Sequence, residues 1–102
     1  MTSYAKADQC SEVLAALAEP TRIRIIEALR GNTRTVTELA ILLQTEIINV
    51  SHHLRILRQA ELVDNKKFGR FVEYSLKPEI VAEDGTLYLD LGWCRVEIPA
   101  VG

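Results

Sequence analysis

The chain has 102 residues, of which 48% are hydrophobic and 25% are charged, and its formal net charge is −2. This length and composition are typical of one globular domain with a modest core. The first ten residues are polar, and no apolar run approaches the roughly 20 residues of a membrane span, so we expect neither a secretory signal nor a membrane segment. Cys10 and Cys94 have no disulfide-framework or metal-ligand spacing, which favours the reducing cytoplasm.

The charges are distributed unevenly. Residues 20–35 and residues 51–71 each sum to +3, whereas residues 79–102 sum to −4. A phosphate backbone responds to the local patch that it meets rather than to the charge of the whole chain. The charge pattern alone leaves two interpretations open, a surface for nucleic acid and a mixed, solvated surface.

Apolar periodicity predicts helices in the first sixty residues. Pro20 suits the first position of a second helix, which Gly31 ends. Thr35 and Glu38 have the spacing of a capping box, although Thr37 is an equally good cap for the third helix. The predicted helices cover residues 7–18, a segment from Pro20 to about Arg30, a short segment around residues 36–43, and residues 47–60.

Beyond residue 60 the hydrophobic period changes to that of β-strands. Residues 62–68 and 71–76 are predicted strands, and the two residues Gly69-Arg70 between them suit a type II′ hairpin turn. Pro78 ends this ribbon. After a turn at Asp84-Gly85, residues 86–98 are predicted to be β-rich, with a hairpin near Gly92-Trp93.

Four segments in chain order resemble one family of regulators. They are Glu19-Pro20-Thr21-Arg22, Val36-Thr37-Glu38-Leu39-Ala40, the segment Val50 to Leu57 (VSHHLRIL), and Leu62-Val63 followed by Gly69-Arg70 and Tyr74-Ser75-Leu76. Over roughly residues 12–77 the chain thus resembles the ArsR-type (ArsR/SmtB-like) transcriptional regulators. The resemblance implies a mainly α fold with a β-wing (α+β), a winged helix-turn-helix.

The resemblance also divides the chain. Residues 1–78 would be the DNA-binding domain, and residues 79–102 a β-rich extension of it, in place of the last helix with which the family pairs across its dimer. Gln44 and Glu46 stand where the family usually has a glycine and a small polar cap. A two-fold homodimer is still expected, because one small core is unlikely to absorb every apolar residue of the tail.

The resemblance implies a cytoplasmic, sequence-specific DNA-binding regulator that acts as a repressor. Residues 47–60 would enter the major groove, while the wing, residues 66–71, would contact phosphates. On a helical wheel the outward residues lie opposite Val50, Leu54 and Leu57. The predicted DNA-binding residues are Ile48, Asn49, Ser51, His52, Arg55, Lys66, Lys67 and Arg70.

Each of these residues also has a simpler interpretation. Arg55 and Ser51 could be solvated surface residues, and Asn49 could merely sit near the helix cap. An outward Ile48 could meet thymine methyl groups or could pack on another protein. The alternative function is therefore a winged helix that binds proteins without specific DNA binding, and a weak salt dependence would distinguish it.

The sequence predicts neither an enzyme nor a metalloprotein. It has no glycine-rich phosphate loop, GxSxG or HExxH motif. His52 and His53 point about 100° apart on a helix and cannot easily share a metal. We expect no cofactor, no metal and no small-molecule substrate. Cys10 and Cys94 are most simply buried thiols, and a thiol sensor built from the pair is the alternative.

Overall fold

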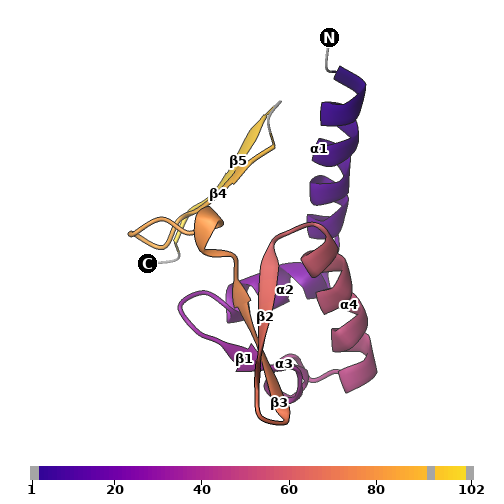
Figure 1. Ribbon diagram of the computed structural model, residues 1–102, viewed down its shortest axis with the longest axis vertical. Coiled ribbons are helices and arrows are strands. Elements are labelled where there is room, and N and C mark those ends of the chain that lie inside the picture. The colour runs from indigo at the N-terminus through magenta and orange to yellow at the C-terminus, as the bar shows by residue number, and fades with distance from the viewer. Residues whose placement is uncertain (1–2, 92–93, 101–102) are drawn as a thin grey trace.

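The computed structural model describes residues 3–91 and 94–100 of the chain. In Figure 1 the β2–β3 ribbon projects from one end of the helical body, and the β4–β5 hairpin lies toward the other end beside α1. The elements in chain order are α1 (Ser3–Leu17), α2 (Pro20–Ala28), β1 (Arg34–Thr35), α3 (Val36–Leu43), α4 (Ile47–Gln59), β2 (Val63–Phe68), β3 (Phe71–Leu76), the 3-10 turn η1 (Pro78–Ile80), β4 (Leu87–Asp90) and β5 (Arg95–Ile98).

The helices begin where their capping residues predict, with one exception. Glu19 caps α2 by accepting a hydrogen bond from the Arg22 N–H (3.1 Å), and Pro20 occupies the first turn. At α3 the capping box is formed by Thr35 and Glu38, so Thr37 is not the cap. The exception is α1, which begins at Ser3 rather than at residue 7, because the apolar stripe used to predict it starts only at Cys10.

A tight turn joins α3 to α4. Gln44 ends α3 in the left-handed conformation (φ 55°, ψ 48°), and the Thr45 N–H donates to the Ala40 carbonyl (3.0 Å). This conformation costs a residue with a Cβ roughly 1–2 kcal/mol, which explains the usual preference for glycine there. Glu46 then precedes α4 without a side-chain cap hydrogen bond. The turn therefore has helix-turn-helix geometry despite both departures in sequence.

The wing is a three-stranded antiparallel sheet with the order β1-β3-β2. Phe68 pairs with Phe71, which leaves Gly69 and Arg70 as a two-residue turn. Gly69 has a φ of +60° whereas Arg70 does not, the pattern of a type II′ turn. The predicted ribbon and turn are thus confirmed. The sequence prediction missed β1, because two residues are too short for a periodic signal.

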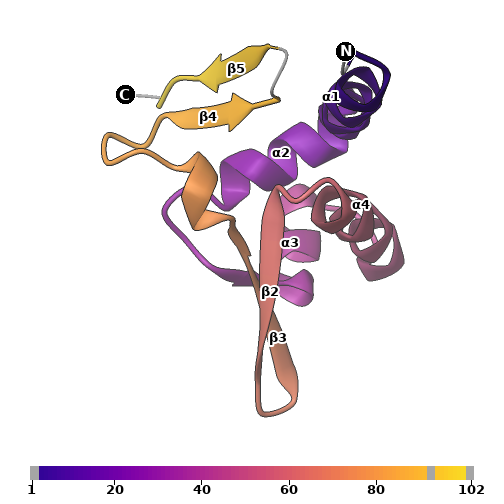
Figure 2. The same ribbon diagram turned by 45° about the horizontal axis from the view of Figure 1, so that its top comes forward.

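The acidic tail folds back as a hairpin. β4 and β5 pair antiparallel, with Leu87 opposite Ile98 and Asp90 opposite Arg95. Arg30, in the turn after α2, holds this hairpin by donating to the carbonyl of Gly85 (2.8 Å) and to that of Ile98 (3.3 Å). The β-rich tail was predicted, but the expected turn residues Gly92 and Trp93 lie outside the described residues. Figure 2 shows the hairpin alongside α2 and well away from the wing tip.

One apolar core connects these elements. It includes fully buried side chains of α2, α3 and α4, such as Ile25, Leu39 and Leu54, and it extends to Leu87 of β4. The core fixes α4 against α2 and α3, so that only the opposite face of α4 is free to contact a ligand. The helix that the family motif assigns to recognition is therefore held rigidly.

Candidate nucleic-acid interface

The structure divides α4 into a buried face and an outward face. Val50, His53, Leu54 and Leu57 are buried. Ile48, Asn49, His52 and Arg55 are exposed, and Ser51 is half-buried. The helical wheel predicted this division, so the five predicted α4 residues share one surface. Their contacts with DNA remain a prediction.

Two of these residues have local contacts. The Asn49 amide donates to the Thr45 hydroxyl (3.0 Å), which fixes its side chain at the start of α4 and leaves its amide oxygen free to accept. The His52 ring lies edge-on to the His53 ring, with centroids 5.4 Å apart. Arg55, by contrast, extends from the middle of the outward face, and the described residues offer its guanidinium no hydrogen-bond or ion-pair partner.

Arg22 connects three helices behind the outward face. Its guanidinium donates to the Ala16 carbonyl (2.6 Å) and the Ala15 carbonyl (3.2 Å) at the end of α1. It also lies 3.1 Å from Nδ1 of His53 on α4. Because arginine only donates hydrogen bonds, Nδ1 must be the acceptor. His53 is therefore neutral, with its proton on Nε2.

The surroundings of His53 favour this neutral form. Burial lowers the pKa of His53, the Glu19 carboxylate 3.7 Å away opposes the lowering, and the charges of Arg22 and His52 reinforce it. Burial tends to raise the pKa of Glu19, but the Arg22 N–H and the facing His53 lower it overall. His53 therefore helps to hold α4 against the rest of the fold and is not part of its outward face. Its position at the edge of the apolar face of the helix predicted this.

The wing distributes its cations over two faces. Alternate residues of a strand point to opposite sides, so Lys67 shares a face with Val72 and Lys66 shares the other with Glu73. Lys66 also lies over the Phe68 ring, 5.4 Å from its centroid. Lys66, Lys67 and Arg70 are all exposed. The structure brings them together at one end of the wing but does not aim the two lysines in one direction.

Two phenylalanines at the wing tip were missed in the sequence analysis. Phe68 is 49% exposed and Phe71 is 63% exposed, and they pair across the strands on either side of Gly69-Arg70. Neither fits the apolar–polar alternation of β3, in which Val72, Tyr74 and Leu76 form the apolar set. The available signal was their position next to the two-residue turn, which projects beyond the reach of the helices. Arg70 therefore lies in a turn that two exposed phenylalanines flank.

The arginines of the basic segment 20–35 are largely engaged within the fold. Three of its arginines donate to backbone carbonyls within the fold: Arg22 as described, Arg30 to Gly85 and Ile98, and Arg34 to Ala28 (2.8 Å). Arg30 additionally pairs with Glu27 (3.0 Å). Only Arg24 of this group is exposed. The exposed positive charges cluster instead on α4 and the wing.

The helix-turn-helix also exposes several apolar side chains. Ile48 is 77% exposed and Ile41 is 72% exposed, while Leu42 and Ile47 are about half exposed. Isolated exposed apolar residues are ordinary, but four around one turn form a patch. This patch is the feature that supports the alternative of a protein-binding winged helix.

Among the described residues no three His, Cys, Asp or Glu side chains gather as metal ligands. None of the helices in that part of the chain is both long and apolar enough to cross a membrane.

A recognition helix held by a preceding helix, followed by a basic ribbon, defines the winged helix-turn-helix class of DNA-binding proteins. Comparison with known proteins narrows this class. The family model of the bacterial regulatory proteins of the arsR family matches residues 19–65. The chain is 33% identical over 73 residues to the transcriptional repressor SdpR of Bacillus subtilis, covering 72% of this chain and 81% of that protein.

Two further matches agree. The chain is 42% identical over 74 residues to a transcriptional repressor SmtB homolog of Synechocystis, covering 72% of this chain but only 56% of that protein. It superposes with a TM-score of 0.72 and 27% identity on the homodimeric winged helix-turn-helix DNA-binding domain of a possible ArsR-family regulator of Mycobacterium bovis, covering 76% and 72% of the two chains. The chain belongs to the arsR family, and it is a DNA-binding transcriptional regulator rather than an enzyme.

Proposed function

We propose that this protein is a cytoplasmic repressor that binds a specific DNA sequence as a homodimer. α4 lies in the major groove, where Ser51, His52 and Arg55 face the bases or the adjoining phosphates. The observation that supports this most directly is the division of α4, whose polar face is free while its apolar face is fixed in the core. The relatives SdpR and the SmtB homolog are both transcriptional repressors, which supports repression rather than activation.

The wing acts on the flanking backbone. Lys66, Lys67 and Arg70 neutralise phosphates, and such contacts position the protein without selecting a sequence. Asn49 and Ile48 lie at the start of α4, where side chains of a recognition helix contact base edges. Asn49 accepts from a donor through its free amide oxygen, and Ile48 contacts a thymine methyl group.

A two-fold dimer would present two copies of α4 to half-sites one helical turn apart, or a multiple of it. The homodimeric neighbour supports this state, as does Leu14 on α1, which is 43% exposed in one copy of the chain. Light scattering at tens of micromolar (an assay concentration) tests it. A dimer is expected, and a monomer would contradict it.

The test of DNA binding is a fluorescence-anisotropy titration of the protein against duplexes from the DNA upstream of its own gene. A scrambled duplex of the same composition is the control, and both are measured at several salt concentrations. Specific binding must be tighter than binding to the scrambled duplex at every salt concentration. Equal affinities would contradict the proposal.

The exposed patch at Ile41, Leu42, Ile47 and Ile48 supports a second candidate, a protein-binding module. Binding of DNA releases counterions, so its affinity falls steeply with salt, whereas a protein partner on an apolar patch need not show this dependence. The pair Ile41→Ser and Arg55→Ala separates the two functions. Loss of DNA binding in Arg55→Ala but not in Ile41→Ser supports the repressor.

A further inference from the structure

The two cysteines of the chain meet in the fold. Cys10 lies on α1 and is only 2% exposed, whereas Cys94 lies between β4 and β5 and is exposed. Their sulfur atoms are 3.3 Å apart, although 84 positions separate the two residues in the sequence. Both are free thiols in this structure. Neither has a place in the proposed DNA surface, which lies on α4 and the wing.

The backbone on both sides of the pair is held in place. Cys10 is in the interior of α1. The Cys94 carbonyl accepts a hydrogen bond from the Leu91 N–H (2.9 Å), and Asp90 pairs with Arg95 in the hairpin. The hairpin itself is bound to the turn after α2 through Arg30. The close approach of the two sulfur atoms is therefore a product of packed secondary structure.

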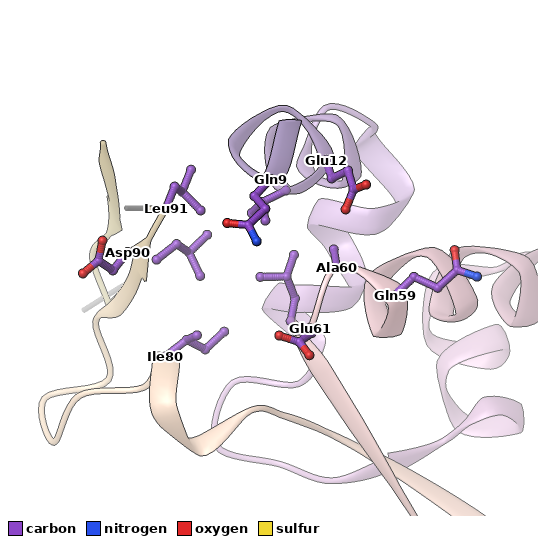
Figure 3. Close-up of a pocket in the computed structure, with 11 residues that line it drawn as sticks. Gln9, Glu12, Gln59, Ala60, Glu61, Ile80, Asp90 and Leu91 are labelled. Carbon is purple, nitrogen blue, oxygen red and sulfur yellow. The ribbon is translucent and has the colours of Figure 1, made fainter. Parts of the chain in front are cut away.

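An open groove lies near the cysteine pair. It has a volume of about 710 Å³ and lies between α1, the end of α4 and the hairpin. Gln9 from α1 and Leu91 from the hairpin line it from opposite sides, and each lies close in sequence to one of the cysteines (Figure 3). The groove is lined by neither cysteine; Cys94 is exposed to solvent itself, whereas Cys10 is buried.

The chemistry of the pair favours a disulfide over a metal. A structural zinc site requires four ligands, and the described residues contain no group of even three. A disulfide requires only that the two sulfur atoms approach by a further ~1.3 Å, to the usual length near 2.05 Å. Movement of one exposed side chain in a hairpin can supply this distance.

We propose that Cys10 and Cys94 form a redox-active dithiol that a hydroperoxide closes into an intramolecular disulfide between α1 and the β4–β5 hairpin. This inference does not depend on DNA binding. Cys94, as its thiolate, attacks the terminal oxygen of the hydroperoxide and the O–O bond breaks. The alcohol (or water) leaves after taking up the proton that the Cys94 thiol released on ionising. Cys94 becomes a sulfenic acid. The sulfur of Cys10 then attacks the Cys94 sulfur, the S–O bond breaks, and the hydroxide leaves as water with the Cys10 proton.

The environments assign these two roles. Cys94 is the exposed thiol, so it meets the oxidant first. The hydrogen bond with Cys94, followed by burial, raises the pKa of Cys10, which keeps Cys10 a thiol until its partner is oxidised. Once Cys94 is a sulfenic acid, the 3.3 Å approach makes attack by Cys10 an intramolecular reaction between preplaced groups. Two electrons pass from the thiol pair to the hydroperoxide.

The experiment treats the full chain with hydrogen peroxide and measures its intact mass and free thiols. We expect loss of two hydrogen atoms, about 2 Da, with loss of both thiols and recovery on addition of a dithiol reductant. A non-reduced digest of the wild-type protein must contain a peptide with Cys10 linked to a peptide with Cys94. Because this readout needs no variant, it does not depend on whether a substitution folds.

Two matched variants test the order of events. Cys10→Ser should accumulate a Cys94 sulfenic acid that a dimedone probe traps, whereas Cys94→Ser should react far more slowly. Disulfides only between chains, or stable sulfenic and sulfinic acids on Cys94 in the wild-type protein, would overturn the proposal. Equal rates of oxidation in the two variants would overturn the assigned roles.

Discussion

Residues 20–35 and residues 51–71 have the same net charge of +3. Their arginines nevertheless have different surroundings in the fold. In the first segment Arg22 connects α2 to α1, Arg30 connects the turn after α2 to the hairpin, and Arg34 connects β1 to the end of α2, each by donating to backbone carbonyls. In the second, Arg55 and Arg70 extend into solvent from α4 and the wing. Equal charge in the sequence therefore corresponds to a structural function in one segment and to an accessible surface in the other.

The comparison shows what a local count of charges omits. An arginine has five N–H donors in a rigid fork, so it can satisfy several carbonyls at helix ends as readily as a phosphate. Whether an arginine donates to the protein or stays available to a phosphate depends on whether unsatisfied backbone carbonyls lie near its guanidinium. Only the tertiary structure determines this. The charge pattern left both interpretations open; the structure shows that most arginines of the first segment are used within the fold and that those of the second are exposed.

The largest effect is expected where an arginine is structural. Arg22→Ala removes charge-assisted hydrogen bonds to Ala15, Ala16 and His53 and leaves those acceptors without their donor. We expect a loss of roughly 2–4 kcal/mol in the free energy of unfolding, measured by urea denaturation. Arg24→Ala, on the exposed side of the same helix, is the control, with a change within about 0.5 kcal/mol. Equally small changes in both variants would remove the distinction between the two segments.

The next effect concerns an arginine of the accessible surface. Arg55→Ala should weaken binding to the specific duplex by roughly 1–3 kcal/mol, or about fivefold to 150-fold, without changing stability. Anisotropy titrations measure it. Arg95→Ala on the hairpin, which Figure 1 places toward the opposite end from the wing, is the matched control and should bind as the wild-type protein does. Similar losses in both variants would argue against an interface on α4.

A smaller effect should distinguish the two wing lysines. Lys67→Ala should reduce the slope of log affinity against log salt by about one unit, as expected for one phosphate contact. Lys66→Ala should reduce it by less, because Lys66 faces Glu73 across the strands and lies over Phe68. Both slopes come from titrations at a series of salt concentrations. A larger change in Lys66→Ala would place the phosphates on the other face of the wing.

The smallest effect is a pH dependence from His53. Since burial lowers its pKa in the folded state, the unfolded chain binds more protons as the pH falls from 7.5 toward 5.5, and stability must decrease. In His53→Asn, whose amide oxygen can accept from Arg22 in place of Nδ1, this decrease should be reduced. Glu19 contributes only at lower pH, because its pKa lies below its ordinary 4.5. His52→Asn is the control, and urea midpoints at both pH values provide the measurement. If His53→Asn keeps the full pH dependence of the wild-type protein, His53 is not the source of that dependence.

Much of the DNA-binding region could be predicted from sequence, because its signals are local. The apolar stripe of Val50, Leu54 and Leu57 predicted which face of α4 is buried. The two-residue spacer predicted the Gly69-Arg70 turn, and the strand 71–76 agrees with the structure at both ends. These features depend on neighbours within a few residues, and the family motifs fall on the same segments.

The features that the sequence did not predict depend on distant contacts. The approach of Cys10 to Cys94 joins residues from the two ends of the chain, and no periodicity within either segment indicates it. The same is true of Arg30, whose acceptors Gly85 and Ile98 lie far along the sequence. The exposure of Phe71 depends on how far the wing extends beyond the helices, which a strand pattern does not specify.

The most direct test of the central claim is a map of backbone amide chemical shifts during titration with the specific duplex. The account predicts that the largest changes fall on residues 48–55 of α4 and residues 66–71 of the wing. Amides around Arg22 of α2, around Arg30 in the turn after it, and in the β4–β5 hairpin should change little. The largest changes on α2 or on the hairpin would contradict the assignment of the accessible basic surface to α4 and the wing.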